Sequence, residues 1–538
     1  MENDAYWKIN HNAFNHSVII GNSLLFPDIL KVINLSHLLK ELIRQIKKMI
    51  IVAFLMILCV AVKSQTSELF IGAATADITP VLPVALAGQY ELRIAKTIET
   101  PLTANVIALE SRDGTGQTDA AIMVACDVGG FPKELIEMVR EQVHKQIPEL
   151  DVKKLFLTAT HTHTAPVLKN DPNDNFQYQI PKEGVTQVEE YRGFFAKRVT
   201  EAIVKAWKNR HPGSVTWGLS HAVVGYNRRT VYADGSAQMY GGTNSPKFLN
   251  MEGMEDHDVN VLFFWNKSGK LIATSLNVSC PAQEAENRSM VNADYWHPVR
   301  EQLKKRFGPE LVVVGWIAAA GDISTRPMYR RAAEDRMVRL RNLTQLEEMG
   351  RRVVFAVEEA YQAVKENRHS NVQLIHKVET LTLPMRLVTD AEYLNCKVEM
   401  EKAEAQIAAD PKAAERVLSI VKWNKAVLDR YEKQKTEPHP ELNVELHVLR
   451  LGDVAICTSE FELFTDYGIQ IQARSNALQT FTIQLTGISR GYLPTENATG
   501  HGGYSAVIQS VMVGPEGGQI LVKRTLSLIN DMFSVAKK

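Results

Sequence analysis

Apolar and polar positions change their spacing several times along the first half of the chain. Between Leu69 and Ile122, short apolar runs are broken by Thr-Pro, Gly and Asp, a pattern typical of strands and turns. Apolar residues at helical spacing follow from Pro132 to Gln146 and around Val188 to Trp207, and the strand-like run Lys154 to Thr160 lies between them. Strands that alternate with helices predict an α/β domain built of layers.

The second half of the chain continues this alternation. A helix is predicted from Thr344 to Lys365, with an apolar face that points to the core. Further strands are predicted at Val259–Trp265, Ile272–Val278, Leu311–Ala318, Leu374–Leu381, Leu446–Leu451, Val454–Thr458 and Thr480–Leu485. We therefore expect one large domain over residues 65–538, with a layered mixed sheet and flanking helices. The chain has no internal repeats, which argues against a solenoid.

The segment from Ala391 to Lys433 has a different composition. It is rich in Glu, Lys and Ala and is interrupted once, at Asp410-Pro411. Two helical stretches separated by a proline-bearing break predict a helical hairpin. We expect this insertion, about residues 389–436, to pack on the domain without chemistry of its own.

The chain carries a candidate export signal near its start. The basic pair Lys47-Lys48 precedes a short apolar run from Met49 to Val62, and the small residue Ser64 follows. This order predicts a secretory signal peptide over residues 49–64 and a secreted or periplasmic protein. The apolar run is too short to predict a transmembrane helix. Residues 1–48 are then an upstream extension outside the fold, and an amphipathic extension around Ile29 to Ile46 is the alternative.

Composition and charge narrow the classes of partner. The chain is 45% hydrophobic and 23% charged, which is typical of a globular protein. Its 61 basic and 61 acidic residues cancel, so no net field attracts nucleic acid, and we expect at most peripheral membrane contact. No protein partner is predicted. After the signal segment, four widely spaced cysteines without a CxxC pair do not form a disulfide framework: Cys126, Cys280, Cys396 and Cys457.

The tetrapeptide His161-Thr162-His163-Thr164 ends the strand-like run at Thr160. In an extended segment, residues two apart point to the same face, so both imidazoles can reach one cavity at the end of a strand. Imidazole is the commonest metal ligand and the side chain best suited to proton transfer near neutral pH. Zinc-dependent hydrolysis is therefore the first hypothesis, and a His pair hydrogen-bonded to backbone or to a carboxylate is the alternative.

Several segments, in the same order, resemble the N-terminal catalytic domain of the neutral/alkaline non-lysosomal ceramidases. The similarity extends from about Phe70 to Gly517. The matching segments are Gly72–Pro80, Asp127–Gly129, Thr160–Pro166, Asn227-Arg228, Gly321–Ser324, Ser459–Phe461, Gly491–Thr495 and Gly502–Tyr504. The resemblance implies a zinc-dependent amidohydrolase of sphingolipid metabolism. It also implies a C-terminal immunoglobulin-like domain, for which this chain leaves no room after Gly517.

The resemblance also implies roles for individual residues. His161, Glu460 and Tyr492 would bind zinc. Tyr504 and Arg228 would face the substrate carbonyl as oxyanion partners. The remaining assignments are His163 as the hydrogen-bonding or proton-transfer group, and Asp294 and Asp322 either as carboxylates that orient ligands or as helix caps.

One segment departs from the family pattern. Where the family has His-x-Thr-Ser, supplying the second zinc His and an essential Ser, this chain reads Ser279-Cys280-Pro281-Ala282-Gln283 with Val278 before it. An ungapped placement puts Cys280 on the His and Gln283 on the Ser. Thiolate binds zinc well, so Cys280 becomes the fourth predicted ligand, with a buried thiol as the alternative. A Gln is no nucleophile, so we expect zinc-bound water to attack, and Ser279 in a shifted register would restore a serine mechanism.

The sequence therefore predicts a secreted zinc-dependent hydrolase that cleaves an N-acyl amide, ceramide or a related lipid amide, with zinc-activated water. Two alternatives remain: a non-catalytic secreted binding protein that keeps the fold, and an esterase or amidase acting on a soluble substrate. The choice among these functions depends on which substrate the mouth of the pocket admits. We expect the long loops Leu168–Thr186 and Thr230–Gly253 to form that mouth.

Overall fold

The structure is a computed structural model that describes residues 37–49, 67–170 and 178–534. The chain divides into two units, residues 1–65 and 66–538. In the first unit, residues 37–49 form an exposed helix. All of the predicted signal segment except its first residue, Met49, lies outside the described residues, so export stays a prediction. Among the described residues, no helix has the length and apolar character needed to span a membrane.

The second unit is built on a large sheet of eight strands in the order β14-β13-β12-β7-β1-β4-β5-β6. Neighbouring strands are antiparallel except at the two ends, where β13 runs parallel to β14 and β5 parallel to β6. The mixed sheet predicted from the sequence is thus confirmed. Its strands are β1 (Glu68–Asp77), β4 (Thr103–Asp113), β5 (Gly116–Cys126), β6 (Leu155–Ala159), β7 (His211–His221), β12 (Asp258–Asn266), β13 (Leu271–Val278) and β14 (Val312–Ile317).

A second sheet has four strands in the order β16-β17-β18-β20: β16 (Leu374–Pro384), β17 (Glu441–Leu451), β18 (Val454–Thr458) and β20 (Gln479–Ile483). The two sheets pack face to face. Leu109 and Phe156 of the large sheet belong to one buried cluster with Leu449 and Ile456 of the small one. Strands that looked equivalent in the sequence therefore belong to two separate sheets.

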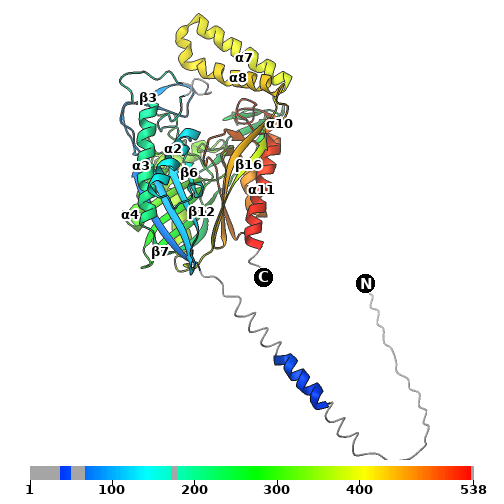
Figure 1. Ribbon diagram of the computed structural model, residues 1–538. Helices are drawn as coiled ribbons and strands as arrows, with labels where there is room; N and C mark the ends of the chain where they lie inside the picture. Colours follow the sequence, from blue (N-terminus) through cyan, green and yellow to red (C-terminus); the bar gives the residue numbers. More distant parts are fainter. Residues whose placement is uncertain (1–36, 50–66, 171–177, 535–538) are drawn as a thin grey trace, which may run out of the picture. The chain divides into compact units, whose positions relative to one another are not determined.

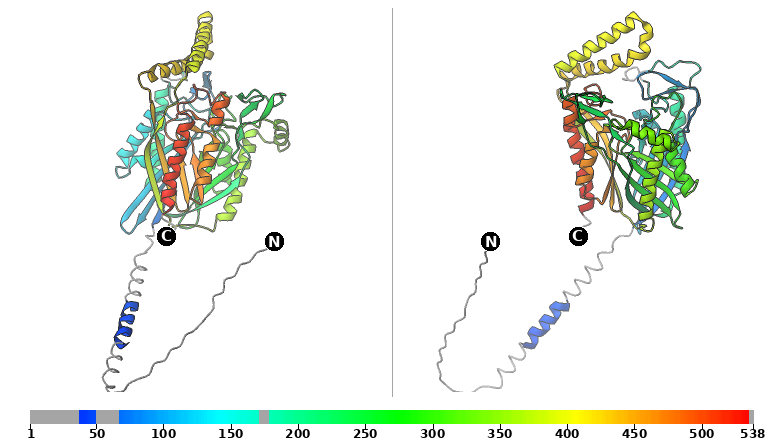
Figure 2. Two further views of the ribbon diagram at one scale, coloured as in Figure 1. Left: turned by 90° about the vertical axis from the view of Figure 1, so that its right-hand side faces the viewer. Right: turned by 180° about the vertical axis from the view of Figure 1, so that it is seen from behind.

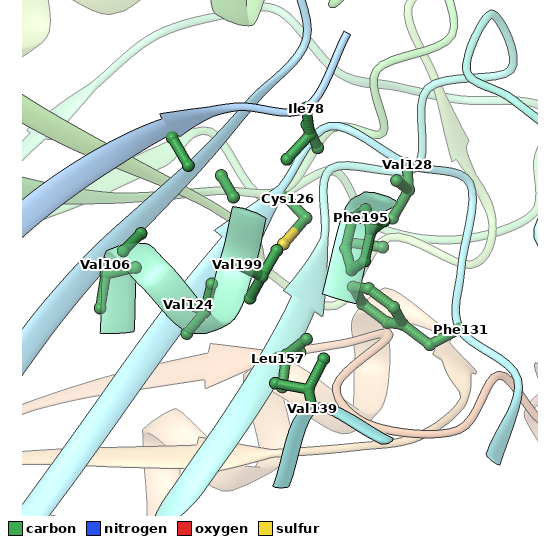
Figure 3. Packing of buried hydrophobic residues seen from close by; sticks show 14 of the residues in the cluster. Ile78, Val106, Val124, Cys126, Val128, Phe131, Val139, Leu157, Phe195 and Val199 are labelled. Atoms are coloured by element: carbon green, nitrogen blue, oxygen red, sulfur yellow. The ribbon is translucent and has the colours of Figure 1, made fainter. Parts of the chain in front are cut away.

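Helices cover the outer face of each sheet, as Figures 1 and 2 show. Helices α2 (Lys133–Gln146) and α3 (Val188–Lys208) pack on one half of the large sheet, where Val139 and Phe195 meet Val124 and Leu157 (Figure 3). The other half and the small sheet are covered by α4 (Trp296–Phe307), α6 (Gln345–Val364), α9 (Thr465–Arg474) and α11 (Pro515–Ser534). The result is a layered order of helices, sheet, sheet and helices.

The predicted helical hairpin is present as α7 (Asp390–Ala409) and α8 (Ala414–Gln434), joined by the short turn η2 (Pro411–Ala413). Thr389 begins α7 with a capping box in which Thr389 and Glu392 bond to each other's backbone N–H. The hairpin projects from the end of the domain where the loop around β3 also lies (Figure 1).

Short strands and short helices within the loops of this domain complete the fold. Three short strands, in the order β10-β9-β11, cover part of the predicted loop Thr230–Gly253, and turns and irregular segments make up the rest. The short elements are β2 (Val84–Leu86), β3 (Arg93–Ala95), η1 (Val152–Lys154), β8 (Tyr226–Asn227), β9 (Arg229–Tyr232), β10 (Ala237–Met239), β11 (Phe248–Met251), β15 (Ile323–Ser324), α5 (Arg331–Leu340), β19 (Glu462–Leu463), β21 (Tyr492–Leu493) and α10 (Glu496–His501).

Candidate active site

The two histidines meet just beyond the end of β6. Their ring centroids are 4.9 Å apart, and the Nε2 atoms of His161 and His163 are 3.4 Å apart. The reason differs from the one predicted. The strand ends at Ala159 and His161 has a φ of 60°, so a turn rather than strand alternation brings the rings together. A positive φ is costly for a side chain of this size, and such residues cluster at functional sites.

The Asp127–Gly129 segment fixes the orientation of His161. Asp127 forms a double ion pair with Arg300, at 2.6 and 2.9 Å, and accepts a hydrogen bond from Thr160 at 3.2 Å. Two residues on, the carbonyl of Gly129 lies 2.5 Å from Nδ1 of His161. A carbonyl only accepts, so Nδ1 carries the proton, and in the neutral ring Nε2 presents its lone pair.

Glu462 is the carboxylate beside His161. Strands β19 and β21 pair in parallel with Glu462 opposite Tyr492, which brings both side chains to one place. Oε2 of Glu462 lies 3.5 Å from Nε2 of His161, and both side chains are largely buried. Burial alone would raise the pKa of Glu462, but His161 and Arg228 outweigh it and lower that pKa. Burial would likewise lower the pKa of His161, and the charge of Glu462 raises it.

Arg228 and Tyr504 complete this side of the cluster. The buried guanidinium of Arg228 donates to Oη of Tyr492 at 3.2 Å and to the carbonyl of Gly321 at 2.8 Å. The Tyr504 ring packs edge-on against that of Tyr492, with centroids 5.6 Å apart. Asp322, next to Gly321, accepts from Thr465 and Asn227 and so fixes the strand that carries Arg228. Burial raises the pKa of Asp322 to about 6.

His163 has partners of its own. The Gln283 side-chain amide donates to Nε2 of His163 at 2.9 Å, and Oε2 of Glu286 lies 3.4 Å from Nδ1. Arg326 holds the other oxygen of Glu286 at 2.7 Å. Burial lowers the pKa of His163, so its ring is neutral near pH 7. A Cβ on Gly88 would lie 2.4 Å from Cγ of His163, so only glycine leaves room for this ring.

Asp294 supports the segment that carries Gln283 and Glu286. Its carboxylate accepts from the backbone N–H of Ala285 at 2.6 Å and from that of Tyr295 at 2.8 Å. Burial raises the pKa of Asp294 to about 7. The carboxylate therefore fixes a loop rather than touching the histidines directly.

Two of the predicted zinc ligands lie elsewhere. Glu460 forms an ion pair with Arg490 at 2.9 Å and accepts from the backbone N–H of Glu445. Cys280 is fully buried and its thiol donates to the carbonyl of Val224 at 3.3 Å. Burial raises the pKa of that thiol well above its usual range, which suits a packed side chain. Ser279, the alternative nucleophile, is also buried and donates to the carbonyl of Ala319 at 2.5 Å.

The structure thus brings together five of the seven residues predicted for the site: His161, His163, Arg228, Tyr492 and Tyr504. It adds Glu462, Glu286 and Gln283, of which only Gln283 was considered from the sequence. Glu462 stands two positions after Glu460, and the β19–β21 register decides which of the two meets His161. In the described ranges, no three His, Cys, Asp or Glu side chains form a group that could hold a metal ion.

A separate cavity includes Asp322 in its lining. It has a volume of about 890 Å³ and is lined by acidic side chains that include Glu252, Asp466 and Glu496. Asp322 is the residue that links the cavity to the strand bearing Arg228. None of the histidines lines it, so this cavity and the cluster are separate features.

The fold is that of a neutral ceramidase. The structure of neutral ceramidase from Pseudomonas aeruginosa superposes with a TM-score of 0.59 at 13% identity and covers 86% of this chain and 75% of its own. A ceramidase complexed with C2 gives a TM-score of 0.60 at 12% identity, with 87% and 75% coverage. No protein-family model and no curated protein sequence matches the chain. At this identity the likeness establishes the fold.

Proposed function

We propose that this protein is a zinc-dependent hydrolase that cleaves an N-acyl amide bond, such as that of ceramide or a related lipid amide. One observation carries the proposal: His161, Glu462, Tyr492, Arg228 and Tyr504 come from distant parts of the chain and converge in one buried cluster. A cluster of charged and phenolic groups costs stability when buried, so its presence points to chemistry. The neutral ceramidase fold supports the same class of reaction.

The donor set beside His161 suits a bound cation. In the neutral ring, Nε2 of His161 directs its lone pair toward Oε2 of Glu462, 3.5 Å away, although a carboxylate carries no proton to share. Such an arrangement is relieved by a proton or a metal ion between the two groups. His161, Glu462 and Tyr492 would hold zinc, three protein ligands as in other catalytic zinc sites. Bound zinc would polarise the substrate carbonyl and lower the pKa of water.

The chain's own residues would perform the remaining steps. Arg228 and Tyr504 would donate to the carbonyl oxygen as negative charge develops there, because both present N–H or O–H groups in a largely buried site. His163, neutral and held by Gln283 and Glu286, would accept the proton of the attacking group and pass it to the leaving amine.

The test compares the two neighbouring glutamates. Glu462→Gln should lose bound zinc and reduce amide hydrolysis by about three orders of magnitude, as expected for a group at the reacting centre. Glu460→Gln is the matched control and should keep zinc and activity within about twofold. Elemental analysis measures the bound zinc. Turnover of ceramide, shorter N-acyl amides and esters measures the activity. Full zinc occupancy and activity in Glu462→Gln would overturn the assignment.

A binding protein without turnover is the second candidate function. Gln283 favours it, because this amide lies against His163 where the family resemblance implies an essential Ser. If the wild-type protein binds lipid amides but neither releases an acid or amine nor depends on zinc, the binding protein is the correct interpretation.

We further propose that the protein is exported, on the sequence pattern of residues 49–64. N-terminal sequencing of the native protein should find a start near Gln65 outside the cytoplasm. An intact Met1 start in the cytosolic fraction would contradict this proposal.

A further inference from the structure

An aromatic path runs from the candidate site to the helical hairpin. The Tyr504 ring contacts Tyr492 on one side and Trp423 of α8 on the other, with centroids 5.6 and 5.9 Å apart. Trp423 in turn meets Tyr90, from the loop between β2 and β3, at 6.2 Å. Tyr492 is 7% exposed and Tyr90 is 36% exposed, so the path leads from the buried cluster toward solvent.

The polar atoms of this path bond to each other. The hydroxyl of Tyr90 donates a hydrogen bond to that of Tyr504, which leaves the Tyr504 O–H for the substrate carbonyl, and burial raises the pKa of both tyrosines. Tyr492 receives its hydrogen bond from Arg228. The surface left for a ligand therefore consists of ring faces and edges, which attract hydrocarbon through burial and dispersion.

Hydrogen bonds hold helix α8 of the hairpin in place near Trp423. Asn424, the next residue, accepts from Gln509 at 3.1 Å. Nearly two turns further on, Arg430 donates to the carbonyls of Ile508 and Val511 at 3.1 and 3.0 Å. These bonds tie α8 to the segment that follows Tyr504, so the position of Trp423 is coupled to the candidate site. Helix α8 and the segment after Tyr504, far apart in the sequence, thus lie side by side.

We propose that Trp423 and Tyr90 bind the acyl chain of the substrate, and that the α7–α8 hairpin, through Trp423, determines the preferred chain length. This inference rests on the proposed function, since it names the part of the N-acyl substrate that the aromatic path receives. An apolar path that opens to solvent and ends beside the reacting groups fits an extended hydrocarbon chain. A sugar would require several free hydroxyl partners, and the hydroxyls of Tyr90 and Tyr492 are already paired.

The test measures chain-length selectivity in Trp423→Ala. With acetyl, octanoyl and palmitoyl amides of one amine, the variant should lose about tenfold or more in kcat/KM for the palmitoyl substrate, through KM. The acetyl substrate should change by less than about twofold, because its chain is too short to reach Trp423. Trp423→Phe keeps a ring and should retain most of the selectivity. Leu394→Ala, on the exposed surface of α7, is the matched control and should behave as wild type.

A binding measurement separates the two proposals. Calorimetry with palmitate should show a Kd about tenfold weaker for Trp423→Ala than for wild type, with or without turnover. If wild type hydrolyses no substrate but this difference in Kd appears, the proposed function fails and the acyl site stands. If Trp423→Ala loses acetyl and palmitoyl turnover equally, or changes neither turnover nor Kd, the acyl site is overturned.

Discussion

Within residues 67–170 and 178–534, the structure buries two pairs of contacting histidines that differ in how their ring nitrogens are used. His161 and His163 come from one turn, and the carboxylates nearest their rings, those of Glu462 and Glu286, lie 3.5 and 3.4 Å from a ring nitrogen. His376 and His447 come from neighbouring strands of the small sheet and are each 1% exposed. Each of their four ring nitrogens has a partner.

The second pair bridges the two sheets. Nδ1 of His376 meets the carbonyl of Ala120 at 3.1 Å, its Nε2 meets Nδ1 of His447 at 3.0 Å, and Nε2 of His447 meets Glu445 at 2.9 Å. Arg140 holds the same carboxylate. Burial would raise the pKa of Glu445, but His447 and Arg140 outweigh it and lower that pKa to about 2. A fully partnered network of this kind has no group left for a substrate, so we assign it to stability.

The comparison shows that the two histidine pairs differ both in burial and in how closely protein groups approach their ring nitrogens. At the first pair, a lone pair faces a carboxylate and a neutral ring adjoins a displaceable amide, Gln283. At the second, each of the four ring nitrogens lies 2.9 to 3.1 Å from a protein partner. The first pair should therefore matter for turnover and the second for folding.

The largest expected effect is on activity at the first pair. His161→Asn, which tolerates the positive φ, should reduce amide hydrolysis by about three orders of magnitude. Its free energy of unfolding should change by less than about 1 kcal/mol, because strained, charged groups at such sites contribute little to stability. Steady-state kinetics and urea unfolding measure the two quantities. If His161→Asn lost as much stability as His447→Ala, the distinction between the two histidine pairs would be removed.

His447→Ala should show the opposite result. It creates a cavity beside Phe156 and removes one partner each from Glu445 and His376, so the free energy of unfolding should fall by about 3 kcal/mol. Turnover per folded molecule should stay within about threefold of wild type at low temperature. If activity is lost while the urea midpoint is unchanged, the second pair has a chemical role.

The second pair should also make stability depend on pH. Burial lowers the pKa of both His376 and His447, with Lys154 and Arg140 nearby adding positive charge. The unfolded chain then binds protons that the folded chain does not, so their contribution is complete above about pH 6.5 and is lost as the pH falls below it. Between pH 7.5 and 5.5, wild type should lose about 1 kcal/mol more stability than His376→Gln. Equal losses in the two proteins would assign the pH dependence to other groups.

The smallest effect concerns the buried thiol. Cys280→Ala should lower the free energy of unfolding by about 1 kcal/mol through a small cavity and leave zinc content unchanged. Cys457→Ala, equally buried in the other sheet's core, is the matched control and should behave alike. Weaker zinc binding in Cys280→Ala alone would return this residue to the metal site.

Many of the elements were predictable from the sequence because their signals are local. Helices α2, α3 and α6 and strands β12 to β14 appear where the spacing of apolar residues placed them, within a few residues. The hairpin was also predicted, because composition changes at Thr389 and a proline breaks it at Pro411. The sequence did not predict how the strands divide between two sheets, because the strands of both sheets are equally apolar.

The candidate site divides in the same way. The sequence by itself determined which residue types are present and the order of the motifs. It therefore gave His161, His163, Arg228, Tyr492 and Tyr504 as candidates. Only the tertiary structure decided that Glu462 rather than Glu460 meets His161, because a register of two short strands, β19 and β21, selects between them. It also directed Cys280 into the core and brought Trp423 of the hairpin beside Tyr504, contacts between distant segments that no local pattern encodes.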